Sequence, residues 1–176
     1  QWYFRYISDH PEATEEDSFR RFGKAVHRVL ELMMRSKQAT GDLPSPKDTD
    51  QMISSAIMAN GPWRPSESIE RVQEASQLIG RFRSVFVGGG DLHPVLTEVP
   101  FLLAGPEGLK IYGFIDLATP DGVWDYKVTY YPRELEYGDT ASDQLNVYAA
   151  AYRLMTGNYP EDLGLVNLVR KVGDVF

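Results

Sequence analysis

The stretch 113–127 constrains the fold more than any other part of the chain, because it sets charged side chains inside apolar runs. The runs 109–118 and 123–128 flank Thr-Pro-Asp-Gly at 119–122. Proline followed by Asp-Gly is typical of the turn of a β-hairpin. The sequence therefore predicts two adjacent strands that both carry acids.

The charged residues in the middle of the runs Phe-Ile-Asp-Leu-Ala and Val-Trp-Asp-Tyr-Lys-Val are Asp116, Asp125 and Lys127. Side chains alternate along a strand, so Asp125 and Lys127 share one face, Tyr126 takes the other, and pairing can bring Asp116 opposite them. Charges within such apolar runs are costly unless they are paired or bound to an ion. From the hairpin alone, three interpretations stay open: a salt bridge between an aspartate and the lysine, an aspartate on the solvent face of an edge strand, or a site for a divalent metal.

Composition limits the chemistry of such a site. The 176 residues contain no cysteine, which excludes disulfides, thiolate zinc sites, iron–sulfur clusters and cysteine nucleophiles. A formal charge of -7 argues against a protein that coats nucleic acid through its overall field, but it allows a nuclease with acids in its site. The length indicates one domain, 1–176, and no apolar run is long enough to cross a bilayer, so we expect a cytoplasmic protein without a membrane partner.

Hydrophobic periodicity predicts helices first and strands later. Ser18 is expected to cap the first helix, with Ile69 and Leu154 on the buried faces of later ones. This order predicts an α/β domain with a central mixed sheet of four or five strands flanked by helices. The expected helices cover 18–36, 48–60, from 66 or 68 to the triple glycine at 88–90, and 141–156, and the expected strands cover 95–103, the two hairpin arms and 163–172.

Four further residues are candidates for the site, each with a structural alternative. His27 borders the apolar stripe of the first helix, where a histidine is either a core residue or a ligand. Glu98 lies in the first strand, as a solvent-face acid or as an accessory acid near the site. Gln144 and Tyr148 lie on the last helix. They are either a surface and a core residue, respectively, or neighbours of the site.

These candidates occur in a characteristic order along the chain. The motifs are His27 within Gly-Lys-Ala-Val-His-Arg-Val-Leu-Glu at 23–31, Gly113-Phe-Ile-Asp116, Asp125-Tyr126-Lys127 and Gln144-Leu-Asn-Val-Tyr148. With these motifs in this order, the chain resembles the RecB-type branch of the PD-(D/E)xK nuclease superfamily, which includes RecB-like exonucleases and nucleases of CRISPR spacer acquisition. Many members of this branch carry a four-cysteine iron–sulfur cluster, which this chain lacks.

The resemblance implies a restriction-endonuclease-like fold and a role for each candidate residue. Mg²⁺ suits an oxygen-rich shell, one imidazole makes Mn²⁺ an especially good substitute, and no iron–sulfur cluster is expected. The expected assignments are Asp116, Asp125 and Lys127 as catalytic residues; His27, Asp116, Asp125 and the backbone carbonyl of Tyr126 as metal ligands; Gln144 and Tyr148 beside the nucleic acid; and Glu98 as an accessory acid.

The expected function is a metal-dependent deoxyribonuclease, in particular an exonuclease of DNA repair or recombination. DNA is the expected partner, and a helicase or recombination partner and an oligomer are compatible with the resemblance. The expected setting is the cytoplasm of a bacterial, archaeal or viral host cell. Two alternatives stay open: a catalytically silent nucleic-acid-binding or scaffold domain of the same fold, and a metalloenzyme that is not a nuclease.

Overall fold

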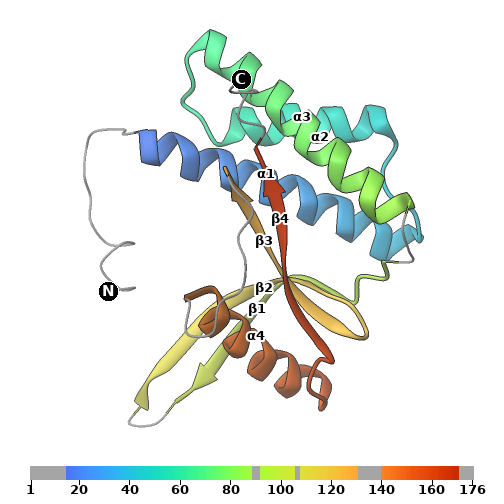
Figure 1. Ribbon diagram of the computed structural model, residues 1–176, viewed down its shortest axis with the longest axis vertical. Helices are drawn as coiled ribbons and strands as arrows, with labels where there is room; N and C mark the ends of the chain where they lie inside the picture. The colour runs from blue at the N-terminus through green and yellow to red at the C-terminus, as the bar shows by residue number, and fades with distance from the viewer. Residues whose placement is uncertain (1–14, 89–91, 106–107, 131–139, 171–176) are drawn as a thin grey trace, which may run out of the picture.

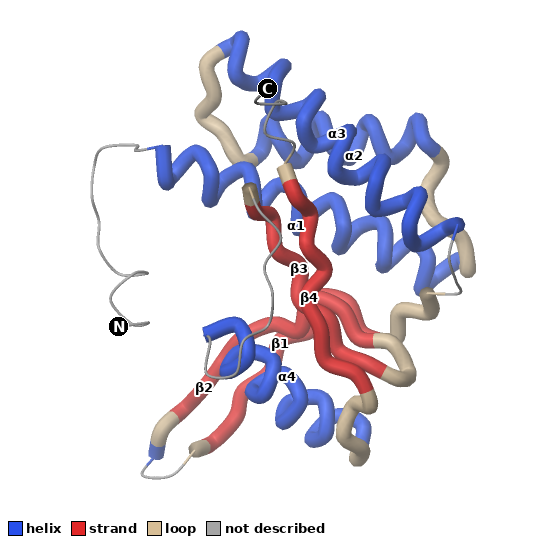
Figure 2. Tube along the Cα trace, in the orientation of Figure 1, coloured by secondary structure: helices blue, strands red, loops and turns tan. Residues whose placement is uncertain are grey.

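The computed structural model describes residues 15–88, 92–105, 108–130 and 140–170, and its elements follow the expected order. The sequence also predicts an aromatic segment docked on the core at 2–7 and a polar connection at 130–139, but residues 2–7 and 131–139 lie outside the described part of the chain. Figures 1 and 2 show the arrangement of helices and strands. The helices are α1 (Glu15–Thr40), α2 (Pro46–Ala59), α3 (Pro65–Gly88) and α4 (Thr140–Thr156), and the strands are β1 (Leu96–Ala104), β2 (Lys110–Ala118), β3 (Gly122–Thr129) and β4 (Asp162–Val169).

The strands form one mixed sheet in the order β1-β2-β3-β4. β2 pairs antiparallel with both β1 and β3, whereas β4 runs parallel to β3. α4 connects the two parallel strands and covers one face of the sheet, and α1, α2 and α3 gather on the other (Figure 1). The predicted α/β architecture, a central mixed sheet flanked by helices, is confirmed.

Two apolar cores fix the helices to the sheet, one on each face. Under α1–α3 the core includes Phe22, Leu30, Met33, Ile57, Ile79 and Tyr126. Under α4 it includes Phe101, Ile115, Leu145 and Tyr152. None of the helices in the described part of the chain combines the length and the apolarity that crossing a lipid bilayer requires.

Helix ends follow local chemistry in α2 but not in α1. The hydroxyl of Ser45 accepts the N–H of Asp48 and caps α2. α1 already begins at Glu15, so the expectation that Ser18 caps it is wrong: this hydroxyl instead donates to Glu67 on α3 at 2.8 Å. Ile69 and Leu154 are exposed rather than buried, because each lies near an end of its helix.

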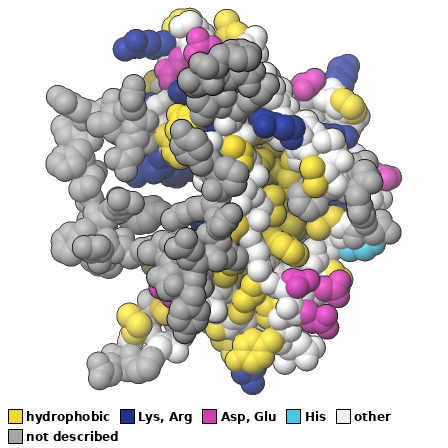
Figure 3. Space-filling model, in the orientation of Figure 1, with side chains coloured by type: hydrophobic (Ala, Val, Ile, Leu, Met, Phe, Trp, Pro, Cys, Tyr) yellow, Lys and Arg dark blue, Asp and Glu magenta, His cyan; other side chains and the backbone are white. Residues whose placement is uncertain are grey.

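An apolar groove of about 500 Å³ follows β4, one of the two edge strands of this sheet. Leu78, Phe82 and Val85 of α3 lie on one side of it, and Trp124 and Leu165 of the sheet lie on the other. Figure 3 shows hydrophobic side chains gathered over β4 in the middle of the view. No carboxylate is among the described residues that line this groove, so the acids of the hairpin are positioned elsewhere.

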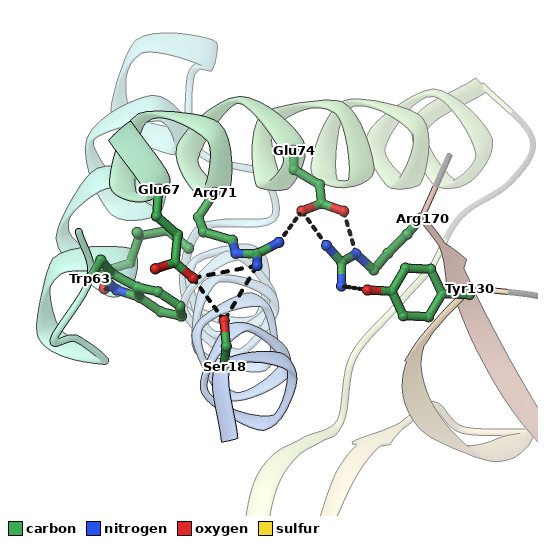
Figure 4. Close-up of polar contacts among 8 residues, drawn as sticks. Ser18, Trp63, Glu67, Arg71, Glu74, Tyr130 and Arg170 are labelled. Carbon is green, nitrogen blue, oxygen red and sulfur yellow. Dashed lines mark hydrogen bonds and ion pairs between the residues drawn. The ribbon is translucent and has the colours of Figure 1, made fainter. Parts of the chain in front are cut away.

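A buried arginine joins the end of β4 to α3 (Figure 4). The guanidinium of Arg170 donates to both carboxylate oxygens of Glu74 and, at 2.8 Å, to the hydroxyl of Tyr130. It also lies 4.9 Å from the ring centroid of Phe22. Arg71 binds the same glutamate at 3.0 Å, so α3 presents one carboxylate to two cations.

Arg170→Met is expected to lower the free energy of unfolding by about 2 to 3 kcal/mol, because several charge-assisted hydrogen bonds of a buried group are lost while Glu74 keeps Arg71. Arg153→Met is the matched control, since that arginine is exposed and its loss is expected to cost less than about 1 kcal/mol. Urea unfolding of both variants measures the difference. Equal stability of Arg170→Met and the parent would contradict the proposed contribution of this junction.

Candidate functional site

The turn between β2 and β3 is the predicted hairpin turn. The N–H of Thr119 donates to the carbonyl of Gly122 at 2.8 Å, and the N–H of Gly122 donates to the Thr119 hydroxyl at 3.0 Å. Only two residue pairs follow in the ladder, Leu117 with Trp124 and Ala118 with Val123. Beyond them the strands separate.

A carboxylate fills the gap between the separated strands. The N–H of Tyr126 donates to Oδ2 of Asp116 at 2.9 Å, so the carboxylate accepts a bond that a strand carbonyl would otherwise accept. Asp116 is buried. The carboxyl group is therefore fixed by backbone geometry and points away from its own strand toward β3.

The carboxylate of Asp116 is one of three potential metal ligands that lie close together. Nδ1 of His27, on α1, lies 3.6 Å from Asp116 Oδ2. One ligand atom each from His27, Glu98 and Asp116 lies within 4.8 Å of the other two. We call these three residues the donor group. Opposite ligands of a cation bound at about 2.1 Å are about 4.2 Å apart, so a small closure of the donor group fits an ion of this size. The two carboxylates suit Mg²⁺ or Mn²⁺, and the imidazole favours Mn²⁺ over Mg²⁺.

Glu98 reaches the donor group through an unusual backbone conformation. Its φ is +50°, a left-handed value that costs a non-glycine residue about 1 to 2 kcal/mol. The β1–β2 ladder pairs Thr97 with Leu117 and Val99 with Ile115 but omits the position between them, where Glu98 faces Asp116. Such strain persists where surrounding structure enforces it and is common at functional sites. The accessory acid expected from the sequence thus lies within the donor group.

The environment of the donor group disfavours its charged forms. Burial, and after it the neighbouring charge of Asp125, raises the pKa of Asp116 well above its usual range, while the Tyr126 N–H acts in the opposite direction. Burial also raises the pKa of Glu98. Burial lowers the pKa of His27 despite the opposing effect of Asp125. The imidazole is therefore neutral at neutral pH, the form that binds a metal, and a cation would relieve the crowding of acids.

A second set of side chains lies on the α4 face of the sheet. Nζ of Lys127 is 2.7 Å from Asp125 Oδ2, an ion pair, and donates to Gln144 Oε1 at 3.0 Å. The amide of Gln144 donates to the Tyr148 hydroxyl at 2.7 Å. That hydroxyl lies 3.4 Å from Asp125 Oδ1, so the four side chains form a closed ring of polar contacts. The predictions that Asp125 and Lys127 share a face and that Tyr126 takes the other are confirmed.

The structure thus divides the expected site residues into two sets. His27, Glu98 and Asp116 form the donor group, whereas Asp125 is not part of it and pairs with Lys127. The two aspartates still interact, because the charge of Asp125 raises the pKa of Asp116. Metal coordination by Asp125 and by the Tyr126 carbonyl stays a prediction.

Glu31 is a residue that sequence reasoning missed. It lies one helical turn after His27, is buried, and forms ion pairs with Arg28 and, at 2.9 Å, with Arg35. Its charge contributes to the raised pKa of Glu98. The spacing of four residues between the histidine and this glutamate is the signal that could have identified it, since such residues share a helix face.

Comparison with known proteins agrees with this geometry. The family model described as the PD-(D/E)XK nuclease superfamily matches residues 1–172. No curated protein and no solved structure matches the chain. The mixed four-stranded sheet with its flanking helices is consistent with the restriction-endonuclease-like fold of that superfamily.

Substitutions at Glu98 separate its ligand role from its backbone strain. Glu98→Gly and Glu98→Ala both remove a ligand, so each is expected to weaken Mn²⁺ binding at least about tenfold in a calorimetric titration. Glycine tolerates a positive φ, so Glu98→Gly is expected to be more stable than Glu98→Ala by about 1 kcal/mol. Glu161→Gln, at an exposed position, is the control. Parental Mn²⁺ affinity in both Glu98 variants would remove this residue from the donor group.

Asp116→Asn is expected to raise the stability of the metal-free protein at neutral pH. The folded-state pKa of Asp116 lies above the unfolded value of about 4. The folded chain therefore binds this proton more tightly, and its stability falls as pH rises from the unfolded toward the folded pKa. Asparagine keeps an acceptor for the Tyr126 N–H and removes the charge.

Thermal melting in EDTA between pH 4 and pH 8 measures this effect, with the exposed Asp42→Asn as the control. The gain in melting temperature is expected to grow with pH. A gain that is absent at pH 8, or equal at both ends of this range, would be inconsistent with a raised pKa at Asp116.

Proposed function

The chain belongs to the PD-(D/E)XK nuclease superfamily, and we propose that it is a metal-dependent deoxyribonuclease of the RecB-type branch, acting as an exonuclease. The observation that carries the proposal is the position of the donor group beside the ion pair of Asp125 and Lys127. A superfamily nuclease needs both a cation site and a positioned positive side chain. Here Asp116 of the donor group and the ion pair of Asp125 and Lys127 lie on adjacent strands, β2 and β3.

The donor group would hold Mg²⁺ or Mn²⁺ through His27, Glu98 and Asp116. A cation bound there supplies a Lewis acid for a phosphoryl oxygen and lowers the pKa of water. The chain itself fixes the ligands: Tyr126 orients the carboxylate of Asp116, and burial keeps the His27 imidazole neutral. These arrangements exist before any substrate arrives, which limits the reorganisation that the reaction requires.

Lys127 supplies the second part of the chemistry. In hydrolysis the oxygen of water bonds to phosphorus, the bond from phosphorus to a sugar oxygen breaks, and that oxygen leaves with a proton as a hydroxyl group. Negative charge builds on the phosphoryl oxygens during this exchange. An ammonium held by Asp125 and Gln144 can stabilise that charge and orient the water.

The two helical motifs support assignment to the RecB-type branch. His27 of α1 reaches the acids from one face of the sheet, and Gln144 and Tyr148 of α4 reach them from the other. A silent scaffold domain is the principal alternative, but it would keep several buried acids without a cation to offset their repulsion. DNA as the substrate, a helicase or recombination partner and an oligomer stay predictions.

Incubation with linear and circular DNA in Mg²⁺, Mn²⁺ or EDTA tests the activity. Cleavage of end-labelled linear DNA with metal, loss of cleavage in EDTA and resistance of circular DNA are the expected results for an exonuclease. Cleavage of circles would indicate an endonuclease. Absence of cleavage with every metal would favour the scaffold domain.

Lys127→Met is expected to keep metal binding and to lower the rate of cleavage by roughly two to four orders of magnitude, because it removes a positioned electrostatic group but none of the donor group. Calorimetry with Mn²⁺ and a digestion assay measure the two effects, and Lys37→Met in the last turn of α1 is the control. If the lysine only forms a salt bridge, the variant instead loses about 3 to 5 kcal/mol of stability. A folded variant that cuts at the parental rate would contradict the mechanism.

A further inference from the structure

The outer face of the β1–β2 hairpin carries large apolar side chains that water can reach. Tyr112 is 80% exposed, Leu102 65% and Phe114 51%. The strand register sets Leu102 opposite Tyr112, and Pro100 opposite Phe114. Because side chains alternate along a strand, these four residues share one face. We call them the aromatic face.

The opposite face of the hairpin is already packed, so these side chains are held outward. Phe101 belongs to the core under α4, and the partly buried Leu103 and Ile111 pack against that core. The ring of Phe101 lies over Gly113, where an added Cβ would come within 2.7 Å of it. Tyr112 and Phe114 flank that glycine on β2, and alternation turns both away from α4. The far end of the hairpin extends past the helical layers (Figure 1).

The aromatic face continues directly into the donor group. Asp116 is two residues beyond Phe114 on β2, and Glu98 is two residues before Pro100 on β1. Two strand residues span about 6.6 Å. Along β2, Phe114 therefore lies about 7 Å from Asp116 and Tyr112 about 13 Å from it. The spacing between Phe114 and Tyr112 along the strand is close to twice the roughly 3.4 Å rise per base of a nucleic-acid strand.

We propose that the aromatic face is a stacking surface for unpaired bases of the nucleic-acid strand that enters the site. This inference rests on the proposed nuclease function. Stacking on aromatic rings tolerates any base sequence and needs unpaired bases, because the faces of paired bases are covered by their neighbours. It also suits a chain of formal charge -7, which cannot attract nucleic acid through its overall field. A second copy of the chain is the less suitable occupant, because on the aromatic face it would cover the approach to the acids of the donor group.

Fluorescence anisotropy with a labelled oligothymidine and with a duplex of equal length tests the proposal. Asp116→Asn in EDTA is the background, since it prevents cleavage and removes one negative charge. The single strand is expected to bind more tightly than the duplex. Tyr112→Ala and Phe114→Ala are each expected to weaken its binding about 5- to 150-fold, the range for loss of one base–aromatic stack.

Matched variants distinguish stacking from general damage. Tyr112→Phe keeps a ring and is expected to bind as the background protein does. Tyr159→Ala removes an exposed tyrosine that packs on Arg153, away from the hairpin, and is expected to change nothing. Thermal melting of each variant checks that it is folded. Unchanged oligothymidine affinity in a folded Tyr112→Ala, Phe114→Ala double variant would overturn the proposal, as would preference of the background protein for the duplex.

The outcomes also separate this inference from the proposed function. Metal-dependent cleavage by the parent, together with unchanged strand binding in the double variant, would reject the stacking surface and keep the nuclease. Strand binding that depends on the two aromatic rings, without cleavage under any metal, would keep the stacking surface and reject the nuclease. If sedimentation shows a dimer that the double variant loses while strand binding is unchanged, the aromatic face binds a second copy and the proposal fails.

Discussion

The hydrogen bond from the Tyr126 N–H to the buried carboxylate of Asp116 is the interaction on which the rest of the site depends. It replaces a strand-to-strand bond, so β2 and β3 can separate without leaving that backbone N–H unsatisfied. The separation lets His27 approach the carboxylate from α1 and leaves Asp125 facing α4. Without an acceptor at this position, continued pairing of the hairpin would close the space in which the donor group lies.

The sheet divides the chemistry between its two faces. Potential metal ligands converge from α1, β1 and β2, whereas the lysine and its supporting amide and phenol lie toward α4. The aspartates of β2 and β3 interact across this division, because the charge of Asp125, after burial, raises the pKa of Asp116. Burial makes this arrangement costly in the metal-free protein, and the same cost favours a divalent cation.

The sequence predicted the order of elements, the hairpin turn and the sharing of a face by Asp125 and Lys127, because periodicity and turn chemistry are local. Sequence reasoning assigned Ser18 to a helix cap, yet its partner is Glu67, far away along the chain. Nor could sequence reasoning show that Glu98 adopts a left-handed φ or that Glu31 is buried near Glu98. Both features depend on how α1 packs against the β1–β2 hairpin. Local patterns identified candidate residues, and tertiary packing decided which of them meet.

Anomalous diffraction from crystals grown with Mn²⁺ tests the central claim most directly, because it locates the cation independently of activity. One peak is expected about 2 to 2.3 Å from the His27 imidazole and from carboxylate oxygens of Glu98 and Asp116. The same map would show whether Asp125 or the Tyr126 carbonyl completes the shell. Ordered side chains at these three residues with no peak between them, in crystals that contain Mn²⁺ elsewhere, would contradict the account.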